Sequence, residues 1–253
     1  MHFGTSIIAR IFQLANGCVI PERAGIYCAG LEMIRFLAAS AVAILAMSDG
    51  VSAQEAAPYA FRGIALNTPL SQFRKLRYPD AAKTGPAPQV QCSTDSSAKP
   101  VTGLYAAAGV ARQIGTVTCA FVEKGADGFP TIRGLEFGDL GKFRTLFKFI
   151  PPKGEKEPRL AAIDITTTDV QQSKIIGFLE RTYGVPVPVG KGITTRAGLN
   201  LPDETREWTN GSSSITLRKV RTNQQSHRIV FQQAALIKIE LEAHEWRMRQ
   251  DRR

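Results

Sequence analysis

Histidine and cysteine are scarce in this sequence, and their positions argue against metal chemistry. The chain has 253 residues, of which three are histidine and four are cysteine. His244-Glu245 resembles the start of a zinc-protease motif, but Met248 stands where the second histidine ligand must lie. No histidine or further cysteine lies at ligand spacing beside Cys92 or Cys119. We therefore expect no metal and no cofactor.

Motifs for nucleophilic and phosphate chemistry are also lacking. The sequence has no G-x-S-x-G elbow, and Gly190-Lys191-Gly192 is too short for a P-loop and lacks the trailing Ser or Thr. Asp164 and Glu180 stand isolated, without a second carboxylate at readable spacing. We expect no catalytic residue and a non-enzymatic protein. A hydrolase-type enzyme whose site is assembled from distant residues is the alternative.

The sequence has no apolar run long enough to span a membrane, which takes about 20 residues. Its longest run, Phe36 to Met47, has 12 apolar or small residues and follows a short basic start at Met33-Ile34-Arg35. Val51-Ser52-Ala53 then places small residues at a cleavage position. This order is typical of a secretory signal peptide. It predicts a signal peptide over 33–53, cleavage near Ala53 and a periplasmic or secreted protein; an uncleaved signal anchor is the alternative.

The signal peptide divides the chain. Residues 1–32 precede it and are either a gene-start artefact or an unusually long n-region. The mature domain is expected over 54–253, with two possible halves at 54–166 and 167–253. Cleavage removes three arginines and three acidic residues, so the net charge of +10 belongs to the mature chain.

Cleavage also changes the meaning of the cysteines. Cys18 and Cys28 leave with the leader, and Cys92 and Cys119 remain in an oxidising compartment. We predict one disulfide between them, which would contribute about 3–4 kcal/mol by the chain-entropy model. Two free buried thiols are the alternative.

The positive charge favours anionic partners through long-range steering. For an exported protein these partners are an acidic protein or an anionic envelope component, and nucleic acid is not expected. Candidate contacts are Arg144 and Lys148 on one strand face, and the terminal Arg247, Arg249, Arg252 and Arg253. With Trp246, the terminal arginines also suit a helix lying on anionic lipid, as in a peripheral membrane protein. Solvated faces that only maintain solubility are the alternative for both groups.

Hydrophobic periodicity predicts an α+β fold with an antiparallel sheet. Strands are expected at 59–66, 115–124, 131–138, 143–150, 160–166 and 228–231, with a hairpin over 205–220 turning at Asn210-Gly211. Helices are expected after the Thr68-Pro69 cap, from a Thr168 capping box to Gly184, and from Ala234 to the C-terminus. Residues 81–100 are expected to be a loop. A strand at 236–241 is the alternative to the start of the last helix.

Two segments resemble small exported proteins of Gram-negative bacteria. Phe61 to Phe73 resembles their "G-I-x-L-G-x-x-x-x-E-F" opening, and Leu179 to Pro186, followed by Trp208 and a hairpin, resembles "L-x-x-K-Y-G-x-P … W". In outline the pattern is similar to the outer-membrane assembly lipoproteins and the β-lactamase-inhibitor-like group of helix-plus-sheet domains. This chain lacks the lipoprotein cysteine and has Asn67 at the family glycine. The resemblance implies a fold and a compartment, and no catalytic residue.

Overall fold

The structure is a computed structural model, and it describes most of the chain after the predicted signal peptide. The described residues are 56–80, 87–96, 101–168, 170–189, 205–220 and 226–252, with the backbone alone at 193–194 and 200–201. Residues 55–253 form one unit. The predicted signal peptide and the predicted cleavage position lie outside the described residues.

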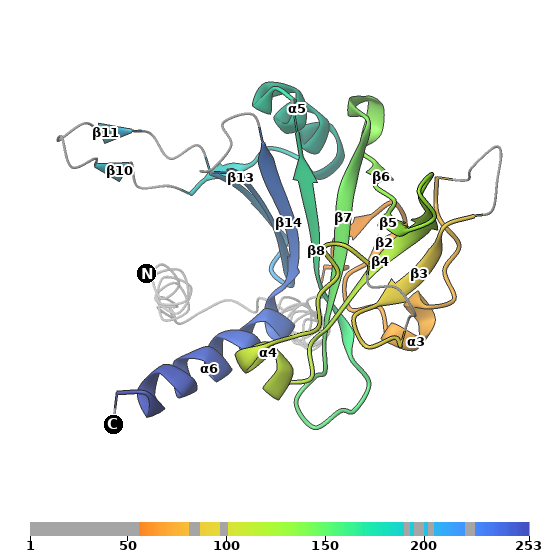
Figure 1. Cartoon of the computed structure of the whole chain (residues 1–253). Helices are drawn as coiled ribbons and strands as arrows, with labels where there is room; N and C mark the ends of the chain where they lie inside the picture. The colour runs from red at the N-terminus through yellow and green to blue at the C-terminus, as the bar shows by residue number, and fades with distance from the viewer. Residues whose placement is uncertain are drawn as a thin grey trace, which may run out of the picture. The chain divides into compact units, whose positions relative to one another are not determined.

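A ten-stranded antiparallel sheet dominates this unit (Figure 1). Eight strands follow one another across it, and two short strands pair beside them. The order is β3 (Gln89–Cys92), β4 (Val117–Lys124), β7 (Lys142–Ile150), β8 (Arg159–Thr167), β14 (His227–Gln233), β13 (Ser213–Lys219), β12 (Arg206–Thr209) and β9 (Val187–Pro188), with β5 (Pro130–Ile132) on β4 and β6 (Leu135–Glu136) on β7.

Four α-helices and two small hairpins complete the described part of the unit. The helices are α3 (Leu70–Phe73), α4 (Gly109–Gln113), α5 (Gln172–Tyr183) and α6 (Ala234–Gln250), and η2 (Gly138–Leu140) is a single 3-10 turn. The hairpins are β1 (Ala60–Phe61) with β2 (Ile64–Ala65), and β10 (Ile193–Thr194) with β11 (Asn200–Leu201). The α+β class with an antiparallel sheet is confirmed.

The main core lies on one face of the sheet. Because side chains alternate along a strand, each central strand directs every second residue inward, and Phe147, Ile163 and Phe231 are fully buried there. Phe73 of α3 and Leu179 of α5 belong to the same hydrophobic cluster. The two helices therefore cover this face, which we call the core face.

The described residues cover the opposite face only in part. At one end, Leu236 of α6 packs with Ile150 and Ala161, and Figure 1 shows α6 leaving the end of β14 with α4 beside it. Over β4, Val101 packs with Ala120 and Val122 in a second small cluster.

Hydrogen bonds hold the first described residues against the β12–β13 turn. The Asn210 side-chain amide donates to the carbonyl of Ala57 at 2.8 Å, and the Ser212 hydroxyl donates to the carbonyl of Ala56 at 3.0 Å. The Ser213 hydroxyl accepts from the Tyr59 N–H at 2.9 Å. The Asn-Gly turn thus organises its own hairpin and also anchors the start of the domain.

The predicted disulfide is confirmed. Cys92 of β3 and Cys119 of β4 lie directly opposite each other, and their sulfur atoms are bonded. Both side chains are buried in the main core. The bond closes a loop between residues 27 positions apart. This pairing places a strand at 89–92, inside the segment that was expected to be a loop.

Several expected elements have different bounds. The strand expected at 59–66 is the hairpin β1–β2, whose turn contains Arg62 at a φ of 53°. The helix after Thr68-Pro69 ends at Phe73, and Tyr78 beyond it is buried and donates to the carbonyl of Gly134.

The last two helices differ in how well their starts were predicted. The capping box at Thr168 is wrong, because β8 continues to Thr167 and pairs there with His227; α5 begins only at Gln172. Gly184 does end that helix, at a φ of 86°. Helix α6 is confirmed, and the alternative strand at 236–241 is wrong.

Candidate functional site

Part of the second sheet face, over β8, β14 and β13, is not covered by any described element. Ile165, Ile229 and Leu217 are fully buried on the core face, so the residues next to them along each strand point the other way. We define the open face by six of these residues, two from each strand: Asp164, Thr166, Arg228, Val230, Thr216 and Arg218. Arg218 is exposed and the other five are half-buried.

Three arginines share one row across this face. The strand register places Arg218 opposite Arg228, Arg228 opposite Thr166, and Thr166 opposite Arg144 of β7. We call Arg218, Arg228 and Arg144 the arginine row. Because adjacent strands lie about 4.8 Å apart, the row extends over about 14 Å.

The three guanidinium groups have different partners. Both Asp164 oxygens accept hydrogen bonds from Arg228, and this bonding raises the pKa of the Arg228 guanidinium. Arg144 donates to the carbonyl of Gly103 at 2.8 Å. Among the described residues, no carboxylate lies within 4.0 Å of the Arg218 guanidinium. The charge of Arg218 is thus available to a partner.

Gly103 positions the side chain of Arg144. It has a φ of 84°, and a Cβ atom there would lie 2.3 Å from an Arg144 guanidinium nitrogen. A side chain at this position would displace the arginine. The segment that covers Ala120 and Val122 therefore also positions one end of the arginine row.

The open face continues to the edge strand β9. Val187 lies opposite Glu207 of β12, which lies opposite Thr216. Val185, Val187 and Val189 follow at every second position, which gives them one side in an extended chain, and their exposed fractions are 87%, 60% and 47%. We call these three residues the valine ridge. It is the apolar border of the open face.

Prolines prevent further strand pairing at this edge. The N–H of Val189 donates to the Thr205 carbonyl at 3.3 Å, so Val187 and Val189 direct their backbone groups toward β12. The alternate positions, which face outward, are Pro186 before Val187 and Pro188 before Val189, and neither has an N–H to donate. Proline at an edge is a known protection against strand addition. This edge thus lacks the N–H groups with which an added strand would pair.

The residues expected from the sequence to contact anions are only partly brought together. Arg144 and Lys148 do lie on the same sheet face, but Lys148 is neutralised by both carboxylate oxygens of Glu240 on α6, at 2.5 and 2.6 Å. Lys148 therefore anchors α6 to the sheet. Arg218 and Arg228 were not singled out from the sequence.

Two of the four terminal arginines, Arg247 and Arg249, lie on the second half of α6. Arg247 is 4.0 Å from Asp251, and Arg249 is 3.5 Å from Glu245. Arg252 is exposed, and Arg253 lies outside the described residues. Trp246 is exposed on the same half of the helix. Among the described residues, no helix is long and apolar enough to cross a membrane.

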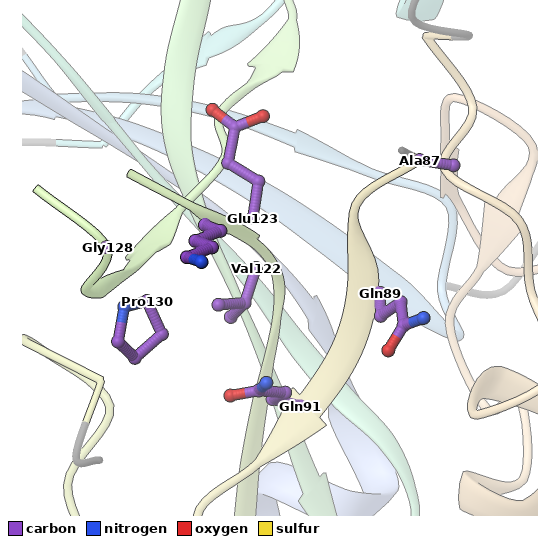
Figure 2. Close-up of a pocket in the computed structure, with 8 residues that line it drawn as sticks. Ala87, Gln89, Gln91, Val122, Glu123, Gly128 and Pro130 are labelled. Atoms are coloured by element: carbon purple, nitrogen blue, oxygen red, sulfur yellow. The ribbon is translucent and has the colours of Figure 1, made fainter. Parts of the chain in front are cut away.

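A shallow pocket of about 270 Å³ lies between β3 and the β4–β5 turn (Figure 2). Figure 2 shows Glu123 extending away from Gln91 and Val122. The Glu123 carboxylate accepts a hydrogen bond from the Arg133 guanidinium at 2.9 Å. The side-chain carbonyl oxygen of Gln91 is buried and has no hydrogen-bond partner among the described residues. The pocket brings no nucleophile and base together.

The other residues that could carry chemistry, His227 and Trp208, are buried in the fold. His227 is buried at the start of β14. Trp208 is buried in the core and donates its indole N–H to the Gly184 carbonyl. Within the described ranges, no group of three or more His, Cys, Asp or Glu residues is arranged to hold a metal ion.

Comparisons with known proteins add no relative. No protein-family model, no curated protein and no solved structure matches this chain.

Proposed function

We propose that this protein is an exported, non-enzymatic protein of the bacterial periplasm that binds an anionic envelope partner through its open face. The signal-peptide pattern supports the compartment. The arginine row supports an anionic partner, because a guanidinium group can donate paired hydrogen bonds to carboxylate or phosphate oxygens.

The observation that carries the proposal is the pairing of Arg218 directly opposite Arg228 on an uncovered face. Like charges directly opposite on neighbouring strands destabilise a sheet. Asp164 forms an ion pair with Arg228, whereas Arg218 has no carboxylate partner among the described residues. An anion bound beside Arg218 would neutralise its charge and accept hydrogen bonds from its guanidinium group.

The test is a binding titration of the exported protein, purified from the periplasm, with poly-L-glutamate. We expect affinity to fall as salt rises, because exposed charges are screened within about 10 Å at 0.1 M ionic strength. Loss of hydrogen bonds to a charged group costs about 1.5–3 kcal/mol. Arg218→Gln should therefore weaken binding by about tenfold or more.

Arg181→Gln is the matched control. Arg181 is exposed in the last turn of α5, which packs on the core face, so this variant loses the same charge on the other side of the sheet. If it weakens binding as much as Arg218→Gln does, the binding follows net charge, and the open face is not the site.

A further inference from the structure

The geometry points to a protein segment as the occupant of the open face: an extended chain that crosses the strands with apolar residues over the valine ridge and carboxylates over the arginine row. This inference rests on the proposed function and names the class of its partner.

The first argument is the combination of two chemistries on one face. The backbone N–H of Val189 donates to the carbonyl of Thr205. Thr205 directly precedes Arg206, which pairs with Leu217, so Thr205 lies beside Arg218 on the next strand. The valine ridge thus borders the end of the sheet that carries the arginine row. A polyanionic sugar would satisfy the arginines but has no apolar groups for the exposed valines, whereas a peptide can carry both.

The second argument is size. From β9 to β7 there are five strand-to-strand steps, or about 24 Å at about 4.8 Å each. An extended chain rises about 3.3 Å per residue, so about seven or eight residues cross the face. A single strand-like segment matches its length.

The third argument is the direction of approach. Pro186 and Pro188 remove the donors from the β9 edge, so an incoming strand finds no N–H groups to pair with there. Recognition then depends on side chains. The arginine row lies about 10 Å beyond the edge at Arg218 and continues for about 14 Å to Arg144. Carboxylates at alternate positions of the segment would meet it.

The experiment uses three fluorescent eight-residue peptides and the exported full-domain protein. The first peptide begins with three leucines and continues with alternating Glu and Ser. The second replaces the leucines with Ser, and the third replaces Glu with Gln. We expect the first to bind at least about tenfold more tightly than either control, since full burial of one aliphatic side chain alone is equivalent to about tenfold.

Two protein variants separate the contributions. Val187→Ser should weaken the leucine-containing acidic peptide by about three- to tenfold and leave the serine-containing acidic peptide unchanged. Arg218→Gln should weaken both acidic peptides. Arg181→Gln should weaken neither. Val187 is already largely exposed, so its substitution leaves the core intact, and unchanged thermal unfolding of the variant checks this.

Two further probes distinguish other anions. If oligogalacturonate or phosphatidylglycerol vesicles bind in an Arg218-dependent manner while the leucine-containing peptide has no advantage over the serine-containing one, the protein-segment inference is overturned and the proposed function stands. If no anionic probe binds, or if Arg218→Gln leaves the binding unchanged, the proposed function and the protein-segment inference are both wrong.

Discussion

Arg218→Gln should make the folded protein more stable while it weakens anion binding. In the structure, Arg218 lies directly opposite Arg228, and no carboxylate of the described residues pairs with it. A favourable cross-strand pair stabilises a sheet by about 0.2–1 kcal/mol, and two like charges directly opposite each other destabilise it. We therefore expect a gain of about 0.2–1 kcal/mol in the free energy of unfolding, which raises the Tm by at most about 4 °C for a domain of this size.

The assay is urea unfolding at low and high salt. Repulsion between two guanidinium groups on an uncovered face is screened, and the Debye length falls from about 10 Å at 0.1 M to about 3 Å at 1 M. The gain from Arg218→Gln should therefore shrink as salt rises. A gain that is independent of salt would point to better strand packing instead of relieved repulsion.

Two variants bracket this prediction. Lys153→Gln removes one positive charge from an exposed loop position between β7 and β8 and should change stability by less than about 0.5 kcal/mol. Arg228→Gln should destabilise, because it leaves the Asp164 carboxylate without its guanidinium partner. If Arg218→Gln is neutral or destabilising at low salt, the reasoning about the arginine row is refuted.

Three further changes test the fold. Cys92→Ser combined with Cys119→Ser, compared with wild type by urea unfolding, should cost about 3–4 kcal/mol; a loss below about 1 kcal/mol would contradict the entropic account. Asp80→Asn should cost about 1.5–3 kcal/mol by the same assay, because its buried carboxylate accepts from the Arg62 guanidinium and the Glu136 N–H. Burial raises the pKa of Tyr183 to about 12, so stability present below pH 10 should be lost as pH rises from about 10 to 12, and Tyr183→Phe should flatten that part of a Tm-against-pH curve.

Much of the fold could be predicted because its information is local. The alternation of Phe143, Phe147 and the residues between them predicts β7, and Asn210-Gly211 predicts the β12–β13 turn. Gly184 correctly predicts the end of α5. Each of these features depends on neighbours within a few positions in the sequence.

The errors arose where a distant contact overrides a local preference. Thr168 has the side chain of a helix cap, but pairing of Thr167 with His227, 60 positions later, extends β8 up to it. The segment that contains Cys92 is rich in loop-forming residues, and yet pairing with β4 makes residues 89–92 a strand. The burial of His227 depends on the same long-range pairing with Thr167.

The arginine row was missed for a related reason: it exists only through the order of the strands. Arg144 could be assigned to an outward face from its own strand, but Arg228 and Arg218 join it only because β14 lies between β8 and β13. A shift of β14 by one residue would bury Arg228 and expose Ile229 and Phe231. The core therefore enforces the register that brings Arg218 and Arg228 together. The core itself requires no arginine at either position, since both side chains point away from it. Arg228 has a structural partner in Asp164, whereas Arg218 has no carboxylate partner among the described residues. Under the proposed function, binding of an anion on the open face is the role of Arg218.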